Sequence, residues 1–186
     1  KIGSDKNVDR VPADRPGNDA CLQCHESFRT RVAEHAHHAE GSVGSQCVAC
    51  HMPRDAYALL KGIRSHRIDS PRVRVSVDTG RLSACNACHL DKTLAWTRDR
   101  LSEWYGAERV SLDARSDVEP AAVVALLRGD AARRALAAAA MGDPNALSAS
   151  GRGWQAPYLT ELVADPYAAV RLIATRSLRA HPQKRA

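Results

Sequence analysis

Three observations predict a mainly α-helical protein in two parts. Three short motifs of the form C-x-x-C-H lie between Cys21 and His89, and the segments around them show little regular patterning. From Pro120 onward the chain is rich in Ala, Leu and Val and contains no Cys. This second part also repeats a helical pattern at an offset of 37 residues. We expect a first domain over residues 1–115 with few regular elements, and a helical repeat unit over 116–186.

All 6 cysteines of the chain belong to the three motifs. The cysteines and histidines of the three motifs are Cys21, Cys24 and His25, then Cys47, Cys50 and His51, then Cys85, Cys88 and His89. In this pattern two thiols add across the vinyl groups of one porphyrin, and the adjacent His reaches the iron. A single copy would also fit a zinc site, a disulfide or a thioredoxin-like pair. Three copies with no cysteine left over predict three covalently bound haem c groups.

The aromatic content is low for an ordinary protein core. The chain of 186 residues has one Phe, three Trp and four Tyr. We therefore expect the porphyrins to supply much of the buried apolar surface of the first domain. The chain without haem is then expected to fold poorly, as small metal-dependent domains do.

The formal charge is +6, and three ferric haems with two neutral axial ligands each would lower it to about +3. The Arg residues are scattered rather than clustered, so we expect no nucleic-acid partner. No apolar stretch approaches the length of a membrane span, which predicts no transmembrane segment and a soluble mature chain. The sequence starts at Lys1 rather than Met, as after removal of a signal or in an excised fragment. Because haem attachment of this type takes place outside the cytoplasm, we expect a periplasmic or extracellular location.

The first domain is expected to contain short elements. Residues 1–18 have the composition of an extended lead-in, and each motif is expected at a helix end. Residues 26–39 contain no Gly or Pro and predict a helix, followed by a loop over 41–45. The run 72–77 alternates as a strand does and, following Pro71, is interpreted as an extended connector.

A longer helix is predicted from Asp91 to Tyr105, ended by Gly106, with Leu94, Leu101 and Trp104 beside Tyr105 on one side.

The second part repeats itself. Matching positions 37 apart are Pro120 and Pro157, Arg134 and Arg171, Ala137 and Ala174, and Met141 and Leu178. Each copy predicts helix, short turn and helix, with Gly129-Asp130 at one turn and Asp165-Pro166 at the other, where Asp165 could cap. The pattern resembles a HEAT repeat. The alternative is an unrelated four-helix appendage with an accidental offset. Two repeats are marginally stable alone, so we expect them to pack on the haem domain or on something outside this chain.

The motif histidines His25, His51 and His89 are the expected proximal iron ligands. Methionine is nearly excluded as a sixth ligand, because Met52 directly follows His51 and Met141 lies in the repeats. Five histidines remain for three irons: His35, His37, His38, His66 and His181. We expect His66, His38 and His35 to be the distal ligands, with His37 as runner-up and His181 solvated.

The expected geometry depends on the segment that contains three of these histidines. If residues 35–38 are helical, His35 and His38 share a face. If they are extended, His35 and His37 share a side instead. A surface cluster without ligand function is the alternative for this segment, and a lone surface or core residue is the alternative for His66.

Several segments together resemble a family of bacterial multihaem cytochromes related to cytochrome c554 that carry C-terminal HEAT or tetratricopeptide repeats. The similar segments are Cys47 to Pro53, His35 to His38 with the Gly-Ser-x-Gly-Ser loop, the Tyr57 segment, Ile63 to Pro71, and Cys85 to Gly106. The resemblance covers about residues 20–180. It implies closely packed bis-His haems, with the His-x-His-His segment and the His of Arg-Ser-His supplying distal ligands.

Bis-imidazole ligation favours an electron carrier over an enzyme, because both axial sites of the iron are filled. We therefore expect electron transfer between redox partner proteins, with the repeats as a docking or assembly surface. The alternatives are a subunit of a multihaem oxidoreductase of the nitrite or hydroxylamine type, which needs an open iron site, and a subunit of an extracellular haem polymer formed by self-assembly.

Overall fold

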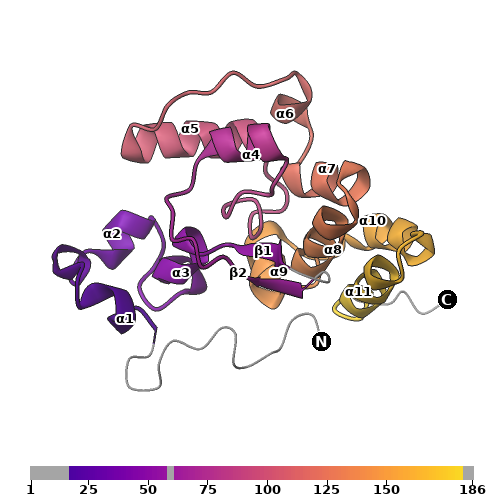
Figure 1. Ribbon diagram of the computed structural model, residues 1–186, viewed down its shortest axis with the longest axis horizontal. Helices are drawn as coiled ribbons and strands as arrows, with labels where there is room; N and C mark the ends of the chain where they lie inside the picture. The colour runs from indigo at the N-terminus through magenta and orange to yellow at the C-terminus, as the bar shows by residue number, and fades with distance from the viewer. Residues whose placement is uncertain (1–16, 58–60, 182–186) are drawn as a thin grey trace.

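The computed structural model describes residues 17–57 and 61–181 (Figure 1). The predicted mainly α-helical class is confirmed: apart from one two-stranded hairpin, the regular elements of the described residues are helices. The first part contains α1 (Asp19–Leu22), η1 (Glu26–Phe28), α2 (Val32–Ala36), η2 (Val43–Ser45), α3 (Cys47–His51), β1 (Arg54–Tyr57), β2 (Lys61–Arg64), α4 (Val73–Thr79) and α5 (Leu94–Tyr105). The extended lead-in expected over residues 1–18 lies almost wholly outside the described residues.

The hairpin is antiparallel and pairs Arg54 with Arg64 and Asp55 with Ile63. It follows α3 directly, and Figure 1 shows it between α3 and the repeat helices. The chain leaving β2 returns to α3, because the amide of Asp69 donates to the carbonyl of His51 at 3.1 Å. The hairpin thus brings the connector to α4 back against the second motif.

The extended connector predicted over residues 72–77 is wrong, because this run forms helix α4. Alternating residues fit a strand locally, but Val73 and Ser76 are both buried, and they stand one helical turn apart. Val73 packs against Leu101 of α5 and Val110 in a small cluster. Burial of Val73 against α5 outweighs the strand-like pattern.

The helix predicted over residues 26–39 is present only in part. A 3₁₀ turn, η1, and the five-residue helix α2 occupy the segment. His37 ends α2 in the left-handed conformation, with φ 53°, which is uncommon for a residue with a Cβ. The predicted loop over 41–45 contains the 3₁₀ turn η2. The reversal at His37 separates the direction of His38 from that of His35.

The predicted long helix is confirmed as α5, which begins at Leu94 rather than Asp91. The Thr93 side chain caps it by accepting from the amide of Trp96, and Gly106 ends it in the left-handed conformation with φ 64°. Tyr105 is 46% exposed.

The second part consists of α6 (Arg115–Val118), α7 (Ala121–Arg128), α8 (Ala131–Ala140), α9 (Pro144–Ser150), α10 (Ala156–Glu161), η3 (Leu162–Ala164) and α11 (Ala168–Leu178). Helix α8 packs against α7 and α11, and α11 packs against α10. Helices α8 and α11 begin 37 positions apart, at the predicted offset. Their Arg134 and Arg171 donate to equivalent carbonyls, those of Gly129 and Pro166.

The predicted cap at Asp165 is wrong, whereas Asp130, expected only at a turn, does cap a helix. Asp130 caps α8 by accepting from the amide of Arg133. Asp165 does not cap α11, whose N-cap is Tyr167. Its carboxylate instead pairs with Arg134, with 2.7 Å between Nε of Arg134 and Oδ2 of Asp165. This ion pair joins the two halves of the unit.

The protein core lies mainly in the repeat unit. Its buried cluster includes Leu126, Met141, Leu159 and Val170, and it also takes in Leu90, which follows the third motif. By contrast, only Leu22 and Ser45 are buried among residues 17–56, the part of this segment whose side-chain burial is described. The segment that carries the first two motifs therefore contributes few side chains to a core of its own.

His181 was expected to be solvated, and that prediction is wrong. It is 5% exposed, and its Nε2 donates to the carbonyl of Met141 at 2.8 Å. This hydrogen bond brings the chain after α11 back against the C-terminal end of α8, so the His181 ring covers that end of the repeat core. No helix in residues 17–57 or 61–181 is both long and apolar enough to cross a bilayer.

Candidate functional site

Each C-x-x-C-H motif forms one helical turn. The amide of His25 donates to the carbonyl of Cys21 at 3.0 Å, and that of His89 donates to Cys85 at 2.8 Å. In the second motif the five residues are α3 itself. Positions i, i+3 and i+4 share one side of a helical turn. The two thiols and the imidazole of each motif are therefore presented together, as attachment to one porphyrin requires.

The first and second motifs lie side by side. Asn18, which precedes α1, accepts from the amide of Cys47 at 2.8 Å and donates to the carbonyl of Ser45 at 2.9 Å. Burial raises the pKa of the Cys47 thiol, and the neighbouring Cys21 thiol raises it further. Asn18 thus joins the start of the first motif to the start of the second.

The second and third motifs are also close to each other. Burial raises the pKa of Cys85 to about 12, and Cys50 adds to this effect. Burial also raises the pKa of Cys88, with smaller contributions from Asp143 at the start of α9 and from Cys50. Such thiols stay protonated at neutral pH, unlike the low-pKa thiolates of redox-active cysteine pairs.

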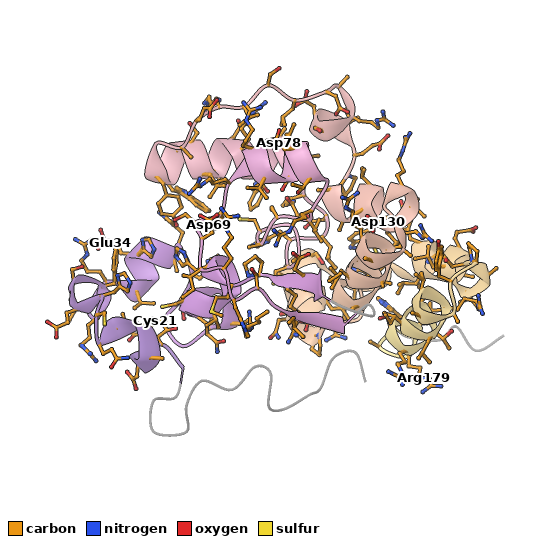
Figure 2. The ribbon with its side chains drawn as sticks, viewed as in Figure 1. Cys21, Glu34, Asp69, Asp78, Asp130 and Arg179 are labelled. Carbon is orange, nitrogen blue, oxygen red and sulfur yellow. The ribbon has the colours of Figure 1, made fainter. Side chains whose placement is uncertain are left out.

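The three motifs follow one another from the edge of the molecule to the repeat unit. Cys21 and Arg179, the residue that follows α11, lie on opposite sides of the molecule (Figure 2). Cys24 and His25 are exposed, whereas His51 and His89 are half-buried. The first motif is therefore the most open to solvent.

His35 of α2 lies opposite the motif histidine His51. The ring centroids are 6.2 Å apart and the rings are nearly parallel, at 6°. The Nδ1 of His51 is 3.0 Å from the carbonyl of Asp69. That carbonyl holds the ring by accepting from Nδ1–H, which leaves Nε2 free for a metal. Burial lowers the pKa of His35, and proximity to His51 lowers it further, so the neutral form is favoured.

His38 faces the third motif in a similar way. Its ring centroid is 6.0 Å from that of His89, at 37°. The Nδ1 of His38 is 2.6 Å from the carbonyl of Ala36, which again leaves Nε2 free. Burial lowers the pKa of His89, and His38 adds to the effect. The segment 35–38 thus supplies one imidazole to each of two motifs.

The other candidate histidines have different surroundings. His37 stacks on Trp104 of α5, with ring centroids 4.2 Å apart. His66 lies exposed in the bend after β2. Within residues 17–57 and 61–181, neither His66 nor His25 makes a close ring contact. The structure brings together His35 with His51 and His38 with His89, and it leaves His25 and His66 apart.

Two supporting residues were not identified from the sequence. Asn86, between the cysteines of the third motif, is fully buried and accepts from the hydroxyls of Ser83 and Thr97 at 2.8 Å. It also donates to the carbonyl of Lys92 at 3.0 Å. The hydroxyl of Tyr105 donates to the carbonyl of His35. A polar residue inside an otherwise apolar motif was the available signal for Asn86.

The spacing of the paired imidazoles fits a haem iron. An imidazole nitrogen binds a metal at about 2.0 Å, so two rings on opposite sides of one ion have centroids about 6 Å apart. In the described part of the chain, no three His, Cys, Asp or Glu side chains converge as a metal site. A haem iron needs only one or two axial side chains, because the porphyrin supplies its other four ligands. The two facing pairs meet that requirement.

No known protein family, curated protein or solved structure matches this chain.

Proposed function

We propose that this chain is an electron-transfer protein that carries three covalently bound c-type haems. The observation that carries the proposal is the pairing of imidazoles across two motifs, His35 with His51 at 6.2 Å and His38 with His89 at 6.0 Å. Each pair joins a motif histidine to one from the segment 35–38. This is the arrangement that two bis-His iron centres require.

The residues of each site have distinct roles under this proposal. The cysteines of each motif hold one porphyrin through thioether bonds, and the motif histidines are the proximal ligands. His35 serves the second iron and His38 the third. His66 is then assigned to the first iron, because His37 stacks on Trp104 and His181 is bonded to Met141. The bound haems would supply one-electron chemistry, and the filled axial positions would keep small molecules from the iron.

The order of the motifs supports a relay. Cys21 neighbours Cys47, and Cys50 neighbours Cys85, so porphyrins attached at these positions would be close together. The shortage of buried side chains in residues 17–56 also supports haem attachment, because porphyrins would supply the missing core.

The partners are proposed to be redox proteins outside the cytoplasm, in the periplasm or at the cell surface. The two-repeat unit would then provide a docking or assembly surface beside the third haem, since the charge of Asp143, which caps α9, acts on the Cys88 thiol. The similarity to cytochrome c554-related multihaem cytochromes with helical repeats agrees with this proposal.

The exposure of His25 favours one second candidate, a subunit of a multihaem oxidoreductase. If His66 does not reach the first iron, that iron has an open axial site at the surface and could bind a small substrate such as nitrite or hydroxylamine.

Mass spectrometry and low-temperature EPR of the oxidised protein test the proposal. We expect a mass increase of three haems, no free thiol and three low-spin signals. A chain with free thiols and no bound haem would contradict it. A high-spin signal from one haem would favour the oxidoreductase.

A further inference from the structure

The loop before the second motif contains a glycine whose missing side chain makes room for His38. A Cβ built on Gly44 would overlap the Cδ2 and Cγ atoms of the His38 ring. The ring cannot withdraw freely, because its Nδ1 is held 2.6 Å from the carbonyl of Ala36. The ring thus lies between its own backbone on one side and Gly44 on the other.

The backbone of Gly44 does not itself demand glycine. Gly44 belongs to η2 and is absent from the residues with positive φ. An alanine there would be compatible with the backbone. A side chain at position 44 is excluded by the imidazole of His38. In this position the His38 ring faces His89, with 6.0 Å between the two ring centroids.

We propose that Gly44 is a positioning residue for the third haem, and that it keeps His38 in the orientation in which His38 binds the iron opposite His89. The inference rests on the proposed function, because it needs the haem to be present. It assigns to the Gly-Ser-x-Gly-Ser loop of the second motif a role at the third.

The chain offers a matched control in the same loop. Gly41 has φ 75°, and a Cβ there would meet nothing within 4 Å. Gly41→Ala therefore strains the backbone by about 1 kcal/mol without touching His38. Gly44→Ala does the reverse, so the two variants separate a loss of loop stability from a displacement of the ring.

The test compares haem-loaded wild type, Gly41→Ala and Gly44→Ala by EPR, and by carbon monoxide binding after reduction. We expect three low-spin haems that do not bind gas in wild type and Gly41→Ala. In Gly44→Ala we expect one haem in three to become high-spin and gas-binding, as in His38→Ala. Wild type with three low-spin haems and an unchanged Gly44→Ala spectrum would overturn the inference alone. Wild type without haem would instead overturn the proposed function.

A double variant covers the case in which Gly44→Ala does not accumulate. Removing the His38 ring frees the space that the new methyl group needs. We therefore expect His38→Ala/Gly44→Ala to accumulate as His38→Ala does and to give the same spectrum. If the double variant is lost while His38→Ala accumulates, Gly44 has a role apart from His38 and the inference is wrong.

Discussion

His35 and His51 lie opposite each other, with their ring centroids 6.2 Å apart and their planes within 6° of parallel. The rings are too far apart to stack on each other and stand at the distance that one metal ion between them would set. The His51 ring is held by its hydrogen bond to the carbonyl of Asp69. His35 is held by the hydrogen bond that its own carbonyl accepts from the hydroxyl of Tyr105. The pair is thus held from two distant parts of the chain.

We expect His35→Ala to leave one haem in three five-coordinate, because the second iron loses its distal ligand. Optical spectra and carbon monoxide binding to the reduced protein measure this change. His37→Ala is the matched control, since His37 stacks on Trp104, and we expect its three haems to stay low-spin. Gas binding in His37→Ala but not in His35→Ala would reverse the assignment.

His66→Ala tests the first haem. With His35 and His38 facing the other two motifs, His66 is the remaining candidate ligand opposite His25. We expect one haem in three to bind carbon monoxide in this variant and none in wild type. If wild type already binds gas at one haem, and His66→Ala adds no second site, then His66 is not a ligand and the oxidoreductase gains support.

We expect Asn86→Ala to lower the free energy of unfolding by about 2–4 kcal/mol, because it leaves the buried hydroxyls of Ser83 and Thr97 without their acceptor. Chemical denaturation of the haem-loaded protein measures the change. Gln23→Ala is the control. Gln23 also lies between two motif cysteines, but it is exposed, so we expect an effect within about 0.5 kcal/mol. Equal effects of the two substitutions would contradict the role of burial.

The ion pair between Arg134 and Asp165 predicts a pH dependence of the repeat unit. The hydrogen bonds from Arg134 lower the pKa of the Asp165 carboxyl below its usual value, and the amide of Tyr167 contributes to the shift. A lowered pKa gives stability that is present above the ordinary value of about 4. That stability is lost as the pH falls through the lower pKa of the folded state.

We expect Asp165→Asn to cost about 1–3 kcal/mol of unfolding free energy at pH 7, because Arg134 loses a mostly buried partner. The cost should shrink as the pH falls below the ordinary carboxyl pKa of about 4 and through the lower pKa of the folded state. Thermal or urea unfolding across this pH range and at pH 7 measures it. Glu108→Gln, which alters the exposed pair with Arg74, should change stability by less than about 1 kcal/mol at either pH. A pH-independent cost in Asp165→Asn would contradict the ion-pair explanation.

Local features were predictable from the sequence because their causes are local. The C-x-x-C-H spacing is closed by hydrogen bonds within one turn, as between His89 and Cys85. Thr93 and Gly106 end α5 through their own side chain and backbone preferences. The 37-residue offset of α8 and α11 follows from a repeated pattern of small and apolar residues.

The predictions that failed concern residues whose state depends on distant partners. The run 72–77 alternates like a strand, yet it forms α4 because Val73 is buried against α5. His181 is buried because its Nε2 reaches the carbonyl of Met141, 40 positions earlier. Asp165 pairs with Arg134 in the preceding repeat instead of capping its own helix.

The sequence alone determined the three motifs, the helical class and the set of histidines available as ligands, since each is a matter of residue type and short spacing. Only the tertiary structure decided which histidine faces which motif. Residues 35–38 form too short a segment for the sequence alone to indicate toward which motif each histidine side chain points. The left-handed turn at His37, and the hydrogen bond from Tyr105 to the carbonyl of His35, direct His35 toward His51 and His38 toward His89. Pairings across the chain arise from packing between segments, and packing is settled only when the whole fold forms.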